Sequence, residues 1–171
     1  MNYLIVVDMQ ADFVNGALGT AEAQAIVPAV ERCIRRFADG KIIFTRDTHF
    51  ENYLSTQEGR NLPVPHCIKD TDGWQIIPEL QPYCTLAVDK PTFGSTALTE
   101  MLCAEHAAHS ISSITLIGLC TDICVISNAL LLKAALPEVE IRVESACCAG
   151  VTPASHENAL AAMRMCQIRV I

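Results

Sequence analysis

Residues 114–125 read Ile-Thr-Leu-Ile-Gly-Leu-Cys-Thr-Asp-Ile-Cys-Val, a short apolar run that leads directly into the start of a helix. Ile114–Ile117 fits a buried parallel strand, and helical spacing follows from Thr121 to about Ala135. A strand that feeds directly into a helix is the building unit of doubly wound α/β sheets. The same segment places Cys124 in the first turn of the predicted helix.

The alternation of strand and helix extends outward from this segment along the chain. Further strands are predicted at 3–7, 41–45, 85–88, 140–143 and 168–171, and further helices at 21–38, 97–109 and 153–166. Asp39-Gly40 is expected to end the first helix, because glycine suits a helix C-terminus. The pattern predicts a single α/β domain over 1–171, a doubly wound, Rossmann-like sheet of about six mainly parallel strands with helices on both faces.

Residues 47–83 interrupt this pattern. They are polar, show no long periodicity and contain four prolines, namely Pro63, Pro65, Pro78 and Pro82. A short helix is expected near 74–80. A connection this long inside a compact domain is usually functional, so we expect it to carry a metal or substrate site.

The bulk properties exclude several classes of partner. The chain has 171 residues, of which 51% are apolar, a net charge of −7 and a pI near 5.1. This acidic balance argues against nucleic acid or an anionic membrane as partner. No signal peptide or membrane-spanning run is recognised, so a cytoplasmic location is expected. The nine cysteines are interpreted as mostly small buried residues of a reducing compartment, with Cys124 as the exception.

Reactive side chains follow the ends of the predicted strands. Asp8 follows the first strand, Asp47 and His49 follow the second, Lys90 follows the third, and Cys124 opens a helix. Because the carboxyl ends of parallel strands share one edge, these side chains are expected to converge. A helix N-terminus and a nearby lysine can lower a cysteine pKa from ~8.5 into the range ~3.5–7.5. Asp8 could then accept and return the thiol proton. Taken singly, each residue also fits a structural role, but their combination indicates a site.

The long connection carries a second group of candidates. Asp47 and His49 stand two residues apart, and Glu58 and His66 follow. Carboxylate and imidazole ligands suit zinc, iron or manganese. The spacing alone favours a turn-capping aspartate with scattered surface histidines over a metal site. The histidines on predicted helices are interpreted as structural or exposed: His106, His109 and His156.

Three motifs in this order resemble the isochorismatase-like cysteine hydrolases, in particular their nicotinamidase branch. They are Val-Val-Asp-Met-Gln-Ala-Asp-Phe at 6–13, Lys-Pro-Thr-Phe-Gly-Ser at 90–95 and Gly-Leu-Cys-Thr-Asp-Ile-Cys-Val at 118–125. The resemblance runs from residue 3 to the end of the chain. It implies that Asp8, Lys90 and Cys124 are catalytic, with Cys124 as nucleophile. It also implies an oxyanion hole from the backbone N–H groups of Cys120 and Cys124, and a cis peptide bond before Cys120.

The resemblance further implies a metal centre and a substrate. The four implied ligands are Asp47, His49, Glu58 and His66, and the divalent metal is expected to be zinc, with iron and manganese as alternatives. The metal would orient the pyridine nitrogen of nicotinamide, and Phe13 would stack on the ring. Two departures concern the substrate, because Thr48 and Pro63 stand where nicotinamidases commonly carry aromatic residues. A homo-oligomer is also implied.

Three functions remain open at this stage. The first is conversion of nicotinamide to nicotinate and ammonia through a cysteine thioester. The second is hydrolysis of another small amide or carbamoyl compound, with the metal absent or structural. The third is a non-catalytic binding protein of the same fold. A flavodoxin-like signalling domain would explain an aspartate after the first strand, but not Lys90 and Cys124 together.

Overall fold

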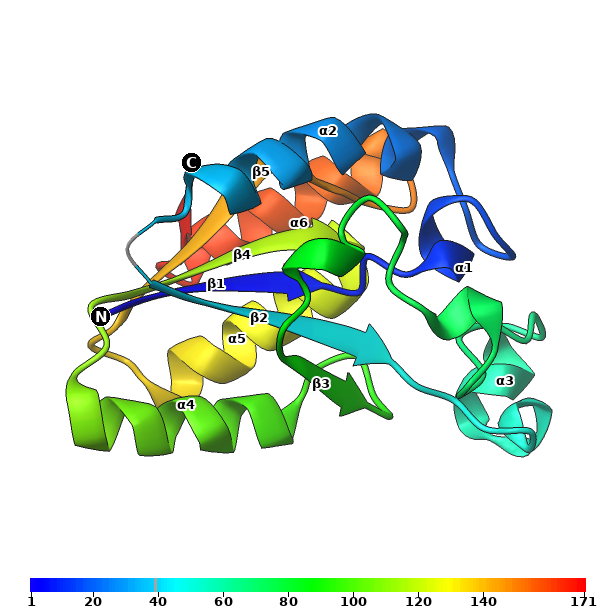
Figure 1. Ribbon diagram of the computed structural model, residues 1–171, viewed down its shortest axis with the longest axis horizontal. Helices are drawn as coiled ribbons and strands as arrows, with labels where there is room; N and C mark the ends of the chain where they lie inside the picture. Colours follow the sequence, from blue (N-terminus) through cyan, green and yellow to red (C-terminus); the bar gives the residue numbers. More distant parts are fainter. Residues whose placement is uncertain (39) are drawn as a thin grey trace.

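The computed structural model describes residues 1–38 and 40–171. Its strands form one sheet in which every pairing of neighbouring strands is parallel. The six strands follow the order β3-β2-β1-β4-β5-β6 (Figure 1). They span β1 Asn2–Val7, β2 Gly40–Asp47, β3 Ala87–Lys90, β4 Ser113–Leu119, β5 Glu140–Ala149 and β6 Arg169–Val170. The chain winds outward from β1 in one direction and from β4 in the other, which confirms the predicted doubly wound α/β fold.

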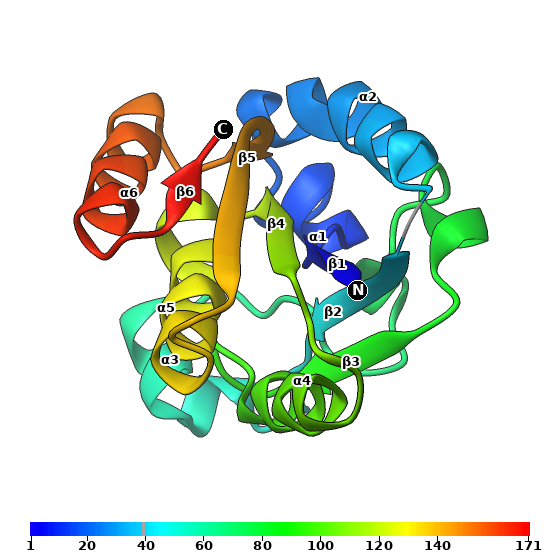
Figure 2. The same ribbon diagram turned by 90° about the vertical axis from the view of Figure 1, so that its left-hand side faces the viewer.

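Helices cover both faces of this sheet, as Figure 2 shows. They span α1 Ala11–Val14, α2 Ala21–Arg36, α3 Gln57–Asn61, α4 Thr96–His109, α5 Ile126–Ala135 and α6 Pro153–Met165. Single 3-10 turns lie at Tyr53–Ser55, Asp72–Trp74 and Gln81–Tyr83, and a π-helical turn, η4, spans Thr121–Val125. None of the described helices is long and apolar enough to cross a membrane.

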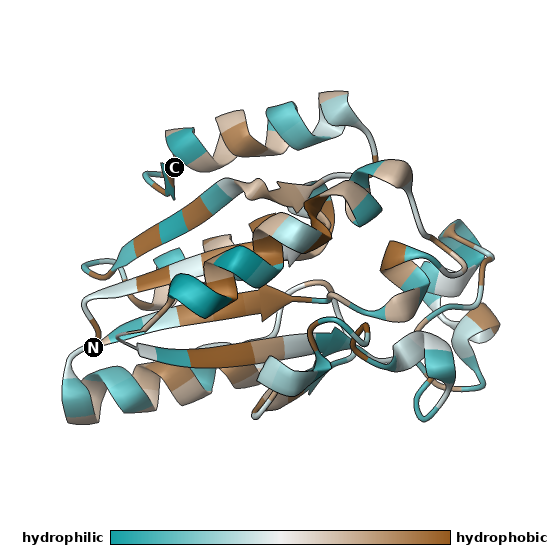
Figure 3. Ribbon diagram, turned by 45° about the horizontal axis from the view of Figure 1, so that its top comes forward, coloured by the Kyte–Doolittle hydropathy of each residue, from teal (hydrophilic) through white to brown (hydrophobic). Residues whose placement is uncertain are grey.

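Alternation along β1 divides the core into two layers. Tyr3, Ile5 and Val7 pack in the layer of α4, α5 and α6. Leu4 and Val6 pack in the layer of α1 and α2. Figure 3 shows the apolar residues concentrated in the strands and polar residues on the helices around them. Successive side chains of a strand point to opposite faces, so one buried strand supplies both layers.

Three of the longer helices have a side-chain hydrogen bond at their N-terminus. The hydroxyl oxygens of Thr20, Ser95 and Thr152 accept a backbone N–H from the first turns of α2, α4 and α6, at 3.0, 3.1 and 3.1 Å. Each such cap stabilises its helix by about 1 kcal/mol, because it satisfies a donor that has no partner within the helix. The start of each of these helices therefore depends on a residue that is local in the sequence.

Several predicted boundaries are wrong. The first helix ends at Arg36, and Gly40 begins β2 instead of ending that helix. A Cβ at residue 40 would lie 2.3 Å from the carbonyl oxygen of Asn2, so the glycine allows two strands to approach closely. The prediction for Asp39 lies outside the described residues. Lys90 is the last residue of β3 and does not follow it.

The short helix predicted near 74–80 is also wrong. Ile76 and Ile77 are buried in the α2 layer, and the N–H of Ile77 donates to the carbonyl of Met9 at 3.0 Å. Pro78 has no N–H to offer a helix. Burial of these two side chains therefore sets the path of the chain here, and only 3-10 turns form on either side.

Candidate active site

Four neighbouring strands deliver polar side chains to one edge of the sheet. Asp8 directly follows β1 with φ of 48°, Asp47 ends β2, Lys90 ends β3 and Cys120 follows β4. The arrowheads of β1 and β2 in Figure 1 point to this edge. The carboxyl ends of β1 and β4 form the topological switch point, where ligands bind in folds of this kind.

Asp8, Lys90 and Cys124 make up what we call the strand-end cluster. The Nζ atom of Lys90 lies 2.6 Å from Oδ2 of Asp8 and 3.3 Å from Sγ of Cys124. It also donates to the carbonyl of Thr92 at 3.2 Å. The hydroxyl of Thr45 donates to Oδ1 of Asp8 at 2.6 Å. All three members of the cluster are buried, so the structure brings together the acid, the ammonium and the thiol selected from the sequence.

Burial governs protonation in the strand-end cluster. Desolvation raises the pKa of Cys124 well above its ordinary value, the charge of Asp8 raises it further, and Lys90 opposes the rise. Burial also raises the pKa of Asp8, again against Lys90. For Lys90 itself burial acts to lower the pKa, but Asp8, Cys124 and Asp47 raise it, so the ammonium stays charged. Desolvation therefore outweighs the lysine charge and favours the thiol form of Cys124, against the lowering of its pKa expected from the helix N-terminus.

Backbone geometry presents Cys124 to the site. The strand β4 ends at Leu119, the peptide bond between Leu119 and Cys120 is cis as expected, and η4 carries Cys124 into α5. The side-chain amide of Asn128 donates to the carbonyl of Cys124 at 2.8 Å, and its oxygen accepts the N–H of Ser95 at 2.9 Å. This buried amide holds the turn of Cys124 against the start of α4. The role of the two N–H groups as an oxyanion hole stays a prediction.

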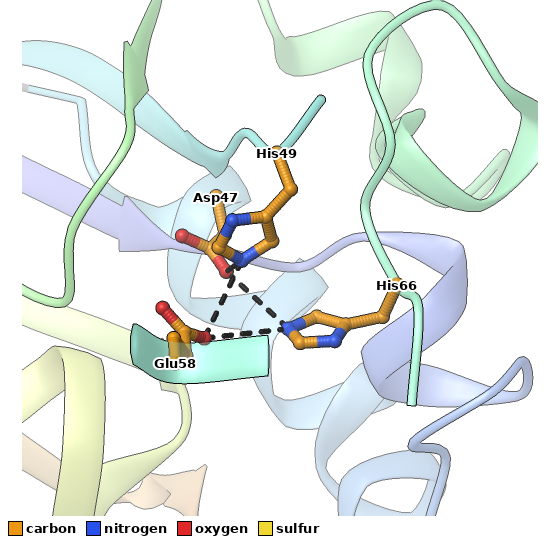
Figure 4. Close-up of side chains that lie close together, drawn as sticks. All are labelled: Asp47, His49, Glu58 and His66. Atoms are coloured by element: carbon orange, nitrogen blue, oxygen red, sulfur yellow. Dashed lines mark hydrogen bonds and ion pairs between the residues drawn. The ribbon is translucent and has the colours of Figure 1, made fainter. Parts of the chain in front are cut away.

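Asp47, His49, Glu58 and His66 make up what we call the metal quartet. Figure 4 shows their side chains pointing toward a common centre, and their ligand atoms all lie within 4.8 Å of one another. Nε2 of His49 lies 3.0 Å from Oδ2 of Asp47 and 3.4 Å from Oε1 of Glu58. Nε2 of His66 lies 3.7 and 3.8 Å from the same two oxygens.

The four nitrogen–oxygen separations of 3.0–3.8 Å bracket the spacing expected around a tetrahedrally coordinated cation. Zinc bonds to nitrogen and oxygen of about 2.0–2.1 Å place neighbouring ligand atoms about 3.3 Å apart. Nδ1 of His66 donates to the carbonyl of Val64 at 2.8 Å, which leaves the Nε2 lone pair facing the quartet. Burial opposes ionisation of Asp47, but the neighbouring imidazoles of His49 and His66 and the charge of Lys90 hold its pKa below the usual range. Two imidazoles and two carboxylates suit zinc, iron or manganese.

A cavity of about 760 Å³ opens onto both groups, because Cys124, Asp47, His49, Glu58 and His66 all line it. Oδ1 of Asp47 lies 3.2 Å from Nζ of Lys90 and so links the two groups directly. One ligand in this cavity would contact the thiol and the quartet together.

Phe13 stands at the wall of the same cavity. The centroid of its ring lies 5.5 Å from that of His66, with 59° between the ring planes. The stacking role of Phe13 stays a prediction.

Sequence reasoning missed two residues that hold the site. Gln10 donates from Nε2 to the carbonyl of Asp47 at 2.9 Å and accepts the N–H of Asp47 at 2.7 Å, so it locks the end of β2 to the segment after β1. Its place two residues after Asp8, inside the first motif, is a signal that could have found it. Thr45 gives no such signal, because it looks like any β-branched strand residue.

His156, interpreted as structural or exposed, is partly buried. Its Nδ1 lies 2.8 Å from the hydroxyl of Thr121, which ties α6 to η4. Of the other two helical histidines, His106 accepts the backbone N–H of Ile111 at 3.0 Å, and His109 is exposed.

The fold and this site together define a class of α/β proteins with a buried thiol, carboxylate and ammonium at the carboxyl edge of a parallel sheet. The chain belongs to the isochorismatase family of hydrolases, since the model of the isochorismatase domain matches residues 2–171. No curated protein sequence matches the chain.

Solved structures of similar fold point to one branch of this family. A pyrazinamidase of Pyrococcus horikoshii, in complex with zinc, is 29% identical with a TM-score of 0.83, over 99% of this chain and 98% of that one. A pyrazinamidase/nicotinamidase of Streptococcus mutans is 25% identical with a TM-score of 0.87, over 100% of both chains. A nicotinamidase of Bacillus subtilis is 25% identical with a TM-score of 0.83, over 99% and 98%. These neighbours support nicotinamidase-like amide hydrolysis.

Proposed function

We propose that this protein hydrolyses nicotinamide to nicotinate and ammonia, with Cys124 as nucleophile and Asp8 as the proton carrier. The observation that carries the proposal is the position of Lys90, whose Nζ lies 2.6 Å from Asp8 and 3.3 Å from Cys124. A buried ammonium there stabilises negative charge on whichever partner has lost the proton. The neighbouring metal quartet shares the same cavity.

The chemistry follows from the resting protonation states. Cys124 gives its thiol proton to Asp8 and attacks the amide carbon, and the N–H groups of Cys120 and Cys124 stabilise the oxyanion. Asp8 then protonates the leaving nitrogen, so ammonia departs and a thioester remains on Cys124. A water molecule that loses a proton to Asp8 then attacks this thioester. The carbon–sulfur bond breaks, Asp8 returns the proton to the sulfur of Cys124, and nicotinate is released. The raised pKa of Asp8 suits a group that must both accept and donate a proton.

The metal quartet would hold the ring end of the substrate. A divalent cation, when bound by its four side chains, supplies a Lewis-acid charge that attracts a ring nitrogen. The chain's own contribution is to fix the ligands: Gln10 clamps the backbone of Asp47, and Val64 sets the tautomer of His66. Phe13 offers its ring face to the pyridine. Orientation by remote contacts of this kind lowers the entropic cost of the reaction.

The decisive experiment measures ammonia release from nicotinamide by the purified protein, with and without a chelator. We expect release that the chelator abolishes and that added zinc restores. We also expect Asp47→Ala and His49→Ala to carry less metal by elemental analysis. Folded, zinc-loaded protein that releases no ammonia would contradict the assignment to nicotinamide. Labelling of Cys124 by a small electrophile then distinguishes another cysteine hydrolase from a non-catalytic protein.

A further inference from the structure

Three exposed apolar side chains gather at the mouth of the active-site cavity, and we call them the apolar rim. Leu62, Phe93 and Val151 all line this cavity and keep 39, 45 and 50% of their surface exposed. They come from three separate connections, after α3, between β3 and α4, and between β5 and α6. Exposed apolar residues that converge on a cavity from separate loops indicate contact with a ligand rather than chance exposure.

Apolar side chains also line the deeper part of the cavity. Phe13, Leu119 and Ile123 also line it, and Leu119 and Ile123 are close to Cys124 in the chain. The volume of about 760 Å³ lies in the upper part of the range of ~300–1,000 Å³ typical for drug-sized ligands. A single-ring amide held between the metal quartet and Cys124 would leave the outer part of this volume, including the apolar rim, without contact.

The charges along the cavity limit what can fill that outer part. Among the described residues, no lysine or arginine lines the cavity, and its carboxylates, Asp47 and Glu58, belong to the metal quartet. Lys90 lies fully buried behind Cys124 and faces Asp8. A substituent with a negative charge would therefore find no basic side chain among the residues that line the cavity. A neutral apolar substituent meets matching surface.

We infer that the preferred substrate is a neutral aromatic primary amide whose ring carries an apolar substituent long enough to reach Leu62, Phe93 and Val151. This inference rests on the proposed function and adds to it the class of substrate. Reaction at the amide is unchanged, with the ring substituent contributing binding only. Each methylene buried against the rim should tighten binding roughly fourfold.

The test compares nicotinamide with its 5-methyl, 5-propyl and 5-carboxylate derivatives on zinc-loaded protein. We expect kcat/KM for 5-propylnicotinamide at least about tenfold above that for nicotinamide, and a loss for the carboxylate. Calorimetric binding to the Cys124→Ala protein measures the same preference without turnover. There we expect the dissociation constant to fall by a similar factor from nicotinamide to the propyl derivative.

Rim variants localise the effect. Leu62→Ser and Val151→Ser should each reduce the preference for 5-propylnicotinamide over nicotinamide. This preference is the ratio of the two kcat/KM values, or of the two binding constants. Leu54→Ser is the matched control, because Leu54 is 53% exposed and does not line the cavity. It should leave that ratio unchanged.

The outcomes separate the two claims. If nicotinamide is hydrolysed but the propyl derivative is neither bound nor hydrolysed better, the inference is overturned and the proposed function stands. If no member of the series is hydrolysed, the proposed function fails. Calorimetry then still tests whether the apolar rim binds the propyl substituent. If the propyl derivative binds more tightly than nicotinamide and Leu62→Ser removes this difference, the apolar rim is its binding site. Equal binding of the two compounds would overturn the inference.

Discussion

The strand-end cluster and the metal quartet share one cavity but are built in different ways. Asp8, Lys90 and Cys124 are attached to strand ends and to the start of a helix, and all three are buried. In the quartet only Asp47 belongs to a strand, while Glu58 sits on the short helix α3 with 22% of its side chain exposed. The sheet therefore positions the candidate catalytic groups, whereas the long connection positions three of the four candidate metal ligands. Changes in the first should alter chemistry and stability, and changes in the second should alter metal affinity.

The largest expected effect is on turnover. Cys124→Ala should lower kcat by ~10³-fold or more while the protein stays folded, because removal of a nucleophile abolishes covalent catalysis. The measurement is ammonia release together with thermal unfolding. Cys148→Ala is the control, since Cys148 is equally buried but outside the cavity, and it should keep its activity. Retention of most activity in Cys124→Ala would sink the assignment of the nucleophile.

The next effect is on stability. Lys90→Met leaves the buried carboxylates of Asp8 and Asp47 without their cation, and breaking a buried ion pair costs about 3–5 kcal/mol. Denaturant unfolding measures this loss. Lys41→Met breaks an exposed pair with Glu105 and should cost only about 0–1 kcal/mol. Similar losses in the two variants would mean that Lys90 is not needed to neutralise the buried carboxylates of Asp8 and Asp47.

Zinc should stabilise the fold through the metal quartet. A ligand that binds only the native state at 100 times its dissociation constant adds about 2.7 kcal/mol to the free energy of unfolding. We therefore expect unfolding in zinc to shift by this amount relative to chelator, and to shift little in Asp47→Ala. If the unfolding free energy of the unmodified protein were the same in zinc and in chelator, the quartet would not be a metal site.

Glu58 tests the exposed side of the quartet. Glu58→Gln keeps the size of the side chain but removes its charge, so zinc affinity should fall by about 10–100-fold while the apo protein keeps its stability. Competition with a zinc-sensitive dye measures the affinity. Glu51→Gln is the control, because Glu51 is exposed and lies outside the quartet. Unchanged affinity in Glu58→Gln would leave a site of three ligands.

The smallest effect concerns the link between α6 and the turn of Cys124. His156→Ala removes the contact with Thr121 and should lower the free energy of unfolding by about 0.5–1.5 kcal/mol. The exposed His109→Ala should change it by less than about 0.5 kcal/mol. Both are measured by thermal unfolding. Equal small losses in the two variants would mean that the contact between His156 and Thr121 contributes nothing to the stability of the fold.

Much of the strand-end cluster could be predicted from the sequence. Apolar β-branched runs mark buried strands, and the parallel order of those strands brings Asp8, Lys90 and Cys124 to one edge. The metal quartet could not be derived in this way, because 47–83 has no periodicity to place Glu58 or His66. Residue type alone made these four side chains candidates, and only the resemblance to the nicotinamidase branch favoured a metal site over scattered polar residues. The structure then places their ligand atoms within 4.8 Å of one another.

Local periodicity and side-chain type are enough to predict the doubly wound sheet and the residues of the strand-end cluster, whereas the metal quartet also needed the resemblance to a family. The burial that favours the thiol form of Cys124, the hydrogen bonds of Gln10 to Asp47 and the placement of Leu62, Phe93 and Val151 on one cavity appear only in the tertiary structure. Desolvation, buried hydrogen bonds and cavity shape arise from contacts between segments far apart in the chain. No local sequence pattern can encode them, because each depends on residues that a distant segment of the chain brings into contact.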